Sequence, residues 1–196
     1  MSEPLPDLRS AFSVILDKID RLLTEANYNG PAISMYLAGG LAVHHYCGTR
    51  YTNDIDASFS QKLLLPAKDL VAAYLNAEHK PEPLYFDANY NPDFALMHPD
   101  HRESAIEWKG LGNEKRKIKL FVLLPVDLAV SKLARYSEQD REDIAALAEA
   151  GLFTEQELRA RAREALEYFV GNKANLMRHI EESCQAVAEA HRRKNK

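Results

Sequence analysis

Two segments decide the fold of this chain: Tyr36-Leu-Ala-Gly-Gly40 and Arg50-Tyr-Thr-Asn-Asp54-Ile-Asp56-Ala-Ser-Phe-Ser60. The first reads as a β-strand that ends at a glycine pair, and the second reads as a strand with two aspartates two residues apart. Because side chains alternate between the faces of a strand, Asp54 and Asp56 are predicted to point the same way while Ile55 enters the core. Two adjacent carboxylates repel each other unless a cation lies between them, and Mg²⁺ prefers hard oxygen ligands. The pair therefore predicts a Mg²⁺ site, and the alternative is an acidic loop or edge strand that faces solvent.

The residues around this pair favour a bound polyphosphate. Gly39 and Gly40 let backbone N–H groups approach a phosphate with no Cβ in the way, and the N-terminus of the helix expected at residues 41–46 favours anions. The alternative is a tight strand-to-helix turn that binds nothing. Arg50 and Thr52 flank the acidic strand and are further candidates for phosphate contact. The alternative for Arg50 is a surface charge paired with a neighbouring acid.

A second candidate group lies further along the chain, beginning at Lys132. If one continuous helix ran through this region, Lys132, Tyr136, Asp140 and Asp143 would share a face suited to a triphosphate and its metal. A solvated lysine is the alternative for position 132. Asp140 has a structural competitor, because Ser137-Glu-Gln-Asp140 fits a capping box that opens a new helix.

These motifs resemble a known family. Gly39-Gly40 followed by Thr52-x-Asp54-Ile-Asp56 resembles the signature of polymerase-β-type nucleotidyltransferases. Pro125-Val-Asp-Leu-Ala-Val-Ser-Lys132-Leu-Ala-Arg135, followed by Asp140-Arg-Glu-Asp143-Ile, resembles the minimal nucleotidyltransferases of the AbiEii type IV toxin group and their uncharacterised bacterial relatives. The resemblance covers about residues 30–150. The chain departs from it in having Gly40 where many relatives have a serine, so a hydroxyl that would contact phosphate is missing.

The resemblance implies a Mg²⁺-dependent enzyme that transfers a nucleotidyl group from an NTP to a hydroxyl of tRNA or of a protein. It also implies an antitoxin protein as a partner. A third carboxylate is common in this superfamily, and the sequence leaves Asp87 and Glu107 both open. The residues to which the resemblance gives catalytic roles are Asp54, Asp56, Lys132 and Asp140, with Gly39, Gly40, Arg50 and Thr52 at the nucleotide.

Two other functions stay open at this stage. A non-catalytic scaffold of the same fold would bind a nucleotide or a protein, although an idle site has no reason to keep two repelling carboxylates. An antibiotic-modifying nucleotidyltransferase would need an acidic pocket for a cationic acceptor. The basic segment at residues 109–119 argues mildly against that second alternative. Its Lys109, Lys115, Arg116, Lys117 and Lys119 either steer an RNA acceptor or are simply solvated.

The pattern of elements predicts an α+β fold, in which a nucleotidyltransferase-like mixed sheet is flanked by helices and followed by a C-terminal helical bundle. Helices are expected at residues 8–26, 41–46 and 66–78, and only helices after Pro125. We therefore expect an α/β core at residues 1–124 and a helical region at residues 125–196 that contributes Lys132 to the site. The expected strands are residues 33–38, 53–59, 84–87, 94–97, 105–108 and 118–123.

Composition narrows the class of protein. A length of 196 residues, 46% of them hydrophobic, is enough for one good core or for a core with a helical appendage. The net charge of −4 and the pI near 6.0 argue against a general nucleic-acid coat protein. Cys47 and Cys184 have no metal-type spacing and are expected to be reduced. With no membrane-length apolar run and no secretory signal pattern, we expect a cytoplasmic protein without a membrane partner.

Overall fold

The computed structural model describes residues 6–111 and 115–194, and their elements form the predicted α+β fold. The chain divides into two compact units built from interleaved segments. The first comprises Met1–Leu41, Tyr51–Tyr90 and Ile106–Val122. The second comprises Ala42–Arg50, Asn91–Ala105 and Leu123–Lys196. The expected boundary between residues 124 and 125 remains a prediction.

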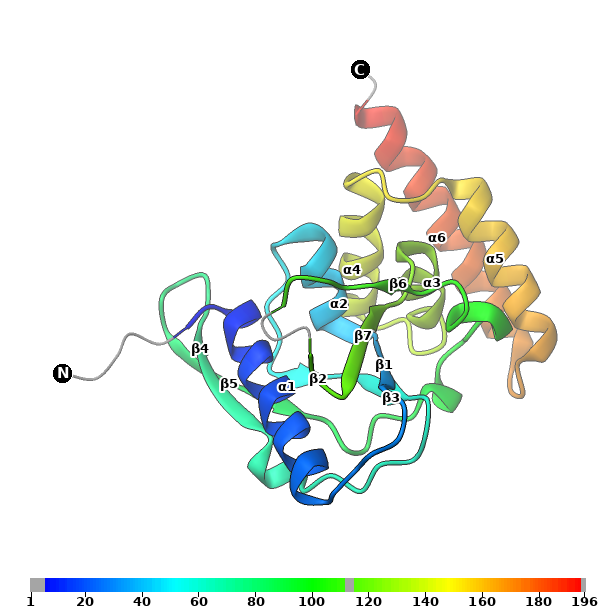
Figure 1. Cartoon of the computed structure of the whole chain (residues 1–196). Coiled ribbons are helices and arrows are strands. Elements are labelled where there is room, and N and C mark those ends of the chain that lie inside the picture. The colour runs from blue at the N-terminus through cyan, green and yellow to red at the C-terminus, as the bar shows by residue number, and fades with distance from the viewer. Residues whose placement is uncertain (1–5, 112–114, 195–196) are drawn as a thin grey trace. The chain divides into compact units, whose positions relative to one another are not determined.

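The first unit contains two sheets (Figure 1). The larger has the order β3-β1-β7-β6, in which β1 is parallel to β7 while β3 and β6 are antiparallel to their neighbours. The smaller has the order β2-β5-β4, with β2 parallel and β4 antiparallel to β5. The strands are β1 (Ile33–Leu37), β2 (Asp54–Ile55), β3 (Ala57–Phe59), β4 (Val71–Leu75), β5 (Pro81–Phe86), β6 (Ile106–Glu107) and β7 (Ile118–Val122).

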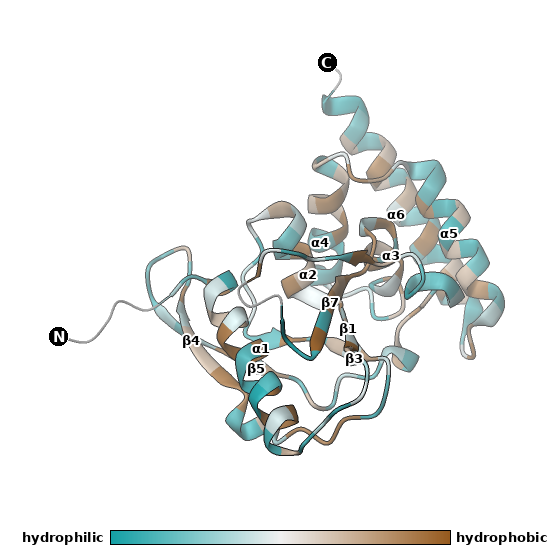
Figure 2. Cartoon of the chain, in the orientation of Figure 1, coloured by the Kyte–Doolittle hydropathy of each residue, from teal (hydrophilic) through white to brown (hydrophobic). Residues whose placement is uncertain are grey.

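One amphipathic helix supplies much of the core of this unit. Helix α1 (Leu8–Glu25) is capped by the Asp7 carboxylate, which accepts a hydrogen bond from the Ser10 N–H at 2.7 Å. Its apolar stripe packs against β4, β5 and β7, and Figure 2 shows the apolar character of β7 in brown. The helix predicted at residues 8–26 is confirmed. Its buried residues are Leu8, Ala11, Phe12, Ile15, Leu16, Ile19 and Leu23.

The strand predicted at residues 53–59 is broken in two at Asp56. Ile55 pairs with Phe86 in the smaller sheet, whereas Ala57 pairs with Leu37 in the larger one. The chain therefore changes sheets at a single residue. The Asp56 carbonyl accepts a hydrogen bond from the Ala38 N–H at 2.8 Å, which ties the break to the end of β1.

Two other predicted elements are wrong. Residues 66–78 form a short 3₁₀ turn (Ala67–Asp69) and strand β4 instead of a helix. Leu70 and Tyr74 are buried, and Tyr74 reaches the core from strand β4, which pairs with β5. Residues 94–97 are not a strand, because Pro92–Phe94 forms a 3₁₀ turn there, capped by the Asn91 side chain. The other predicted strands are present within one to three residues of their expected ends.

The second unit is helical. Helix α2 (Gly39–Cys47) leads into it from the first unit, and a 3₁₀ turn (Pro99–His101) precedes its main helices. These are α3 (Pro125–Ser131), α4 (Glu138–Glu149), α5 (Glu155–Tyr168) and α6 (Lys173–Lys194). Helix α6 packs against α4 and α5, as Figure 1 shows. Its buried residues are Leu176, Ile180, Ser183, Cys184 and Val187.

Two smaller expectations concern the cysteines and membrane spans. Cys47 and Cys184 are both free thiols, as expected for reduced residues. Burial raises the pKa of the Cys184 thiol to about 11, which keeps it protonated and unreactive at neutral pH. In the part of the chain that the structure describes, no helix combines the length and apolarity needed to cross a bilayer.

We predict that Tyr74→Phe lowers the free energy of unfolding by about 1–2 kcal/mol. The buried Tyr74 hydroxyl donates to the Thr52 carbonyl at 3.1 Å and to Asn53 Oδ1 at 3.3 Å, so its loss leaves the Thr52 carbonyl without that donor. Tyr28→Phe is the matched control, because the Tyr28 hydroxyl donates to the Pro31 carbonyl at an exposed position. Urea unfolding measures both, and an equal loss in the two variants would contradict the prediction.

Candidate functional site

The Asp54 carboxylate is held by its neighbour two residues earlier. Asp54 and Asp56 are partly exposed while Ile55 and Ala57 are buried, so the predicted burial of Ile55 is confirmed. That the two carboxylates point the same way remains a prediction, because the chain changes sheets at Asp56. The Thr52 hydroxyl donates a hydrogen bond to Asp54 Oδ1. Thr52 is itself buried, and its carbonyl is bonded to the Tyr74 hydroxyl. In this structure Thr52 therefore fixes the direction of one acidic side chain. Its contact with a phosphate remains a prediction.

The Asp56 carboxylate lies against Gly39. A Cβ built on Gly39 would stand 1.8 Å from Asp56 Oδ2, and Gly39 has a φ of +61°, which side chains rarely adopt. Only glycine satisfies both conditions. Gly40 follows in the first turn of α2, and its φ is not positive. A carboxylate is thus already placed at the start of α2, where the helix dipole favours negative charge.

The strand register distinguishes the two candidates for a third carboxylate. Asp54 pairs with Tyr85 and Ile55 with Phe86, so extending this parallel register by one residue sets Asp56 beside Asp87. The Asp87 N–H donates to the Ile55 carbonyl at 3.2 Å, which ties Asp87 to the end of β2. Glu107 instead lies on the edge strand β6, within 3.4 Å of Lys109. Among the described residues, no three His, Cys, Asp or Glu side chains are grouped to hold a metal by themselves.

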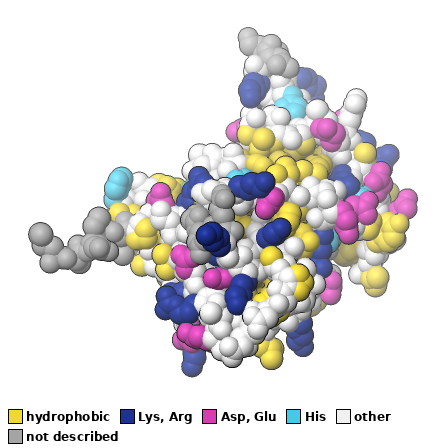
Figure 3. All heavy atoms as spheres, viewed as in Figure 1, with side chains coloured by type: hydrophobic (Ala, Val, Ile, Leu, Met, Phe, Trp, Pro, Cys, Tyr) yellow, Lys and Arg dark blue, Asp and Glu magenta, His cyan; other side chains and the backbone are white. Residues whose placement is uncertain are grey.

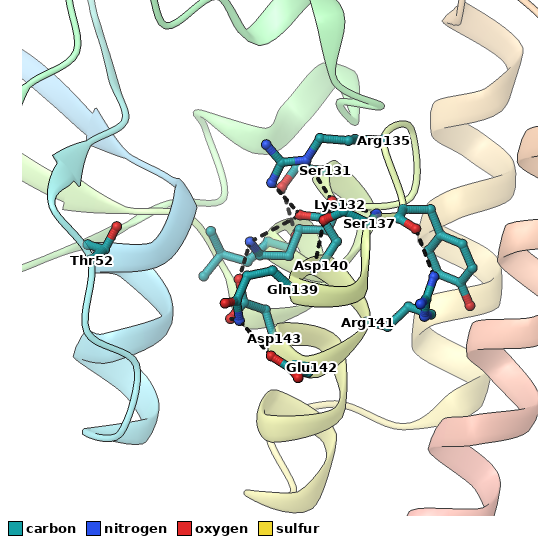
Figure 4. Close-up of polar contacts among 12 residues, drawn as sticks. Thr52, Ser131, Lys132, Arg135, Ser137, Gln139, Asp140, Arg141, Glu142 and Asp143 are labelled. Carbon is teal, nitrogen blue, oxygen red and sulfur yellow. Dashed lines mark hydrogen bonds and ion pairs between the residues drawn. The ribbon is translucent and has the colours of Figure 1, made fainter.

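In the second unit, Lys132 belongs to a buried group of charges (Figure 4). Its Nζ lies 2.6 Å from Asp143 Oδ2 and 3.8 Å from Asp140 Oδ1. The Arg50 Nε donates to Asp143 Oδ1 at 3.1 Å. Lys132, Asp140 and Asp143 are each less than 8% exposed, so the lysine is not the solvated residue of the alternative interpretation. Arg50 is paired with Asp143, which agrees with the alternative interpretation that Arg50 pairs with an acid.

Asp140 closes the start of α4 and also holds an arginine. Ser137 and Asp140 form the reciprocal capping box, and Arg135 donates two hydrogen bonds of 2.7 Å to the Asp140 carboxylate. Burial alone would raise the pKa of Asp140. The hydrogen bonds from Arg135 and Ser137, with the nearby Lys132 charge, outweigh it and lower this pKa to about 2. The carboxylate is therefore charged at every physiological pH.

The continuous helix expected to carry Lys132, Tyr136, Asp140 and Asp143 on one face is not formed between residues 131 and 138, all of which the structure describes. Helix α3 ends at Ser131 and α4 begins at Glu138. Between them Tyr136 has a φ of +53°, and its ring stacks on His179 at 4.4 Å, so it leaves the predicted face. The contribution of Arg135 was not predicted. Arg135 precedes Asp140 by five residues and lies just before the capping box, and this spacing could have predicted the ion pair.

The basic segment expected to be solvated or to steer RNA is partly structural. The Arg116 side chain is 5% exposed, and its Nε donates to Asp17 at 2.7 Å. The Lys117 Nζ donates to the Tyr28 carbonyl at 2.7 Å. Residues 112–114 of this segment lie outside the described residues. Figure 3 shows basic side chains interspersed with acidic ones on the face it presents.

Comparison with known proteins places the chain in a family. The model of a family described as "Nucleotidyltransferase of unknown function (DUF6036)" matches residues 14–187. This match includes both acidic groups and the glycine pair. A search of curated proteins gives no match.

We predict that Gly39→Ala is more destabilising than Gly48→Ala. Both glycines have a positive φ, +61° and +74°, so both alanines carry the same backbone strain of about 1–2 kcal/mol. Nothing lies within 4 Å of a Cβ at Gly48, whereas a Cβ at Gly39 meets the Asp56 carboxylate. Urea denaturation should give a loss for Gly39→Ala that exceeds the control by about 1 kcal/mol or more. Equal losses would show that Asp56 does not need the space.

We predict that Asp140→Asn costs about 2 kcal/mol of stability at pH 7, because its pKa is lowered from 3.8 to about 2. A carboxylate whose pKa is lower in the folded state stabilises the fold when the pH is above its unfolded-state pKa. That stabilisation disappears as the pH falls from about 4 towards 2. The difference between parent and variant in urea should therefore shrink between pH 5 and pH 3. Glu157→Gln is the control, because Glu157 closes an exposed capping box with Thr154. A difference that stays constant with pH would contradict the assignment.

Proposed function

The chain belongs to this nucleotidyltransferase family, and we propose that it is a Mg²⁺-dependent enzyme that transfers a nucleotidyl group from an NTP to a hydroxyl acceptor. The observation that carries the proposal is the placement of Asp54 and Asp56. Both are partly exposed, Asp54 is oriented by Thr52, and Asp56 is packed over a glycine that no other residue can replace. The resemblance to polymerase-β-type and AbiEii-type enzymes supports the same proposal.

The donor set suits Mg²⁺. This ion is usually held by one or two carboxylates, with phosphate and water oxygens completing its shell, so a pair of aspartates is sufficient. Asp54 and Asp56 would hold it. When bound, Mg²⁺ would neutralise phosphate charge and lower the pKa of an attacking hydroxyl. Asp87 is the best-placed third carboxylate because the β2–β5 register sets it beside Asp56, whereas Glu107 lies on β6.

In the proposed reaction, a hydroxyl oxygen of the acceptor forms a bond to the α-phosphorus of the NTP. The bond from that phosphorus to the oxygen bridging to the β-phosphate breaks, and pyrophosphate leaves with the electron pair. The hydroxyl proton passes to Asp87 or to water. Such transfers depend mainly on positioning and on charge neutralisation, which is what the fixed carboxylates offer.

We propose that the second unit serves this reaction through its positive charge. Three cations, Arg50, Lys132 and Arg135, surround the two carboxylates of Asp140 and Asp143, so the group has an excess of positive charge. Lys132 and Asp140 keep their proposed catalytic roles at the triphosphate. Lys132 has a structural role as well, since removing it would strip Asp143 of its 2.6 Å partner.

Two finer proposals follow from the resemblance. The acceptor hydroxyl belongs to tRNA or to a protein, and the enzyme acts as the toxin of a toxin–antitoxin pair. Modification of a small cationic antibiotic is the alternative. A scaffold that only binds a nucleotide is a further alternative, and the precise fixing of both aspartates favours the enzyme.

We predict that Asp54→Asn and Asp56→Asn each abolish Mg²⁺-dependent transfer while the melting temperature changes little. Asparagine keeps the shape and still accepts the Thr52 hydrogen bond, but it lacks the charge that the metal requires. Transfer of label from α-³²P-NTPs to total tRNA and to protein measures activity, and calorimetry measures Mg-NTP binding. Asp93→Asn, at an exposed position, is the control. Two variants that bind Mg-NTP as well as the parent would refute the metal site.

A further inference from the structure

A groove of about 800 Å³ in the first unit begins at the residue that follows Asp56. One side is formed by β3 and the segment after it, from Ala57 to Pro66, and the other by the end of β5 with Asp87, Ala88 and Tyr90. The groove therefore begins one residue from the proposed metal ligand, and its lining includes the proposed third carboxylate. A molecule lying along it would have one end at the reacting phosphate.

One of the strands that line this groove, β3, has an open edge. The Asp56 carbonyl and the Ser60 N–H both bond to the β1 side, to Ala38 and Ser34. In an antiparallel pair the hydrogen-bonding residues alternate, so the N–H and C=O groups of Ala57 and Phe59 point the other way. On that side, β3 has no neighbour among the described strands, because it ends the order β3-β1-β7-β6. Such an edge is a template for one more strand.

The side chains of the groove match a polypeptide better than a polynucleotide. Its apolar members include Leu63, Leu65 and the ring pair of Phe59 and Phe86, whose centroids are 5.8 Å apart. Its charged members are one cation, Lys62, and one anion, Asp87. Neutralising several phosphates of a nucleic acid requires several cations, which this lining does not offer. Main-chain hydrogen bonds together with apolar pockets for alternate side chains are the features that bind an extended peptide.

From these observations we infer that the acceptor is a polypeptide, which adds to the free edge of β3 as a further strand. A serine, threonine or tyrosine of this segment, lying next to Asp56, is the nucleotidyl acceptor. Its side-chain oxygen bonds to the α-phosphorus, the bond to the bridging oxygen breaks, pyrophosphate leaves, and the proton passes to Asp87 or to water. This inference rests on the proposed function and selects the protein over the RNA acceptor.

The test uses the full chain with Mg²⁺, α-³²P-NTPs and two probes: total tRNA, and a peptide library with a central Ser, Thr or Tyr flanked by random residues. Labelled peptides are then remade with single N-methylated amides. Because N-methylation removes one backbone donor and leaves side chains intact, methyl groups at alternate residues should reduce labelling about tenfold while the intervening ones have little effect. This periodic pattern depends on strand addition and needs no change to the protein.

Two variants of the protein give an independent readout. Phe59→Pro removes one N–H from the free edge and should reduce peptide labelling about tenfold with unchanged affinity for Mg-NTP. Lys62→Glu is the control, because it reverses the charge of Lys62, the cation among the described residues of the groove lining, and should affect peptide labelling little.

The outcomes separate this inference from the proposed function. Label on tRNA but not on peptides, or a large loss with Lys62→Glu, would overturn the peptide acceptor and leave the enzyme intact. Peptide labelling that is insensitive to N-methylation would overturn strand addition. Failure to bind Mg-NTP and to label any probe would overturn the proposed function and this inference with it.

Discussion

The contact between the Asp56 carboxylate and the backbone of Gly39 is the constraint on which the first unit depends. The carboxylate occupies the space that any side chain at residue 39 would need, and the positive φ of Gly39 turns the chain from β1 into α2. At Asp56 the chain also leaves the smaller sheet for the larger one, and the Ala38–Asp56 hydrogen bond joins the two turns. One pair of residues thus sets the end of a strand, the start of a helix, the change of sheet and the position of a carboxylate.

The charged group of the second unit solves a different physical problem. Burying Lys132, Asp140 and Asp143 removes them from water at a large cost, which is offset only where each charge has close and well-directed partners. The Asp143 carboxylate accepts hydrogen bonds from Lys132 and Arg50. The Asp140 carboxylate accepts hydrogen bonds from Arg135 and forms the capping box with Ser137. These contacts join three stretches that are separate in sequence: the segment after α2, the break between α3 and α4, and α4 itself. The same side chains therefore stabilise the unit and concentrate positive charge, so a structural role does not argue against a functional one.

The sequence predicts these features unevenly, and the reason lies in the range of each interaction. The capping boxes of α4 and α5 and the stripe of α1 are local, so spacing alone finds them. Residues 70–75 mislead because buried Leu70 and Tyr74 are four apart, which suits a helix, while the partner that makes β4 a strand lies in β5. The break of residues 53–59 at Asp56, and the pairing of Arg50 with Asp143, also depend on partners distant in the chain. Pattern reasoning therefore finds the acidic pair and misses how it is held.

The contacts of the basic residues between positions 109 and 119 help to decide between an RNA and a protein acceptor. Five cations between residues 109 and 119 look from the sequence like an RNA-steering surface. Arg116 is instead buried on Asp17, Ser13 and the Leu111 carbonyl, and Lys117 holds the Tyr28 carbonyl, so both join the basic segment to α1 and the turn that follows it. Counterion release requires cations that are able to reach phosphates, and these two are committed to the protein. The groove beside Asp56 adds one lysine and one aspartate. The groove lining therefore gives a polynucleotide little to bind, whereas the free edge of β3 offers hydrogen-bonding groups to a polypeptide backbone.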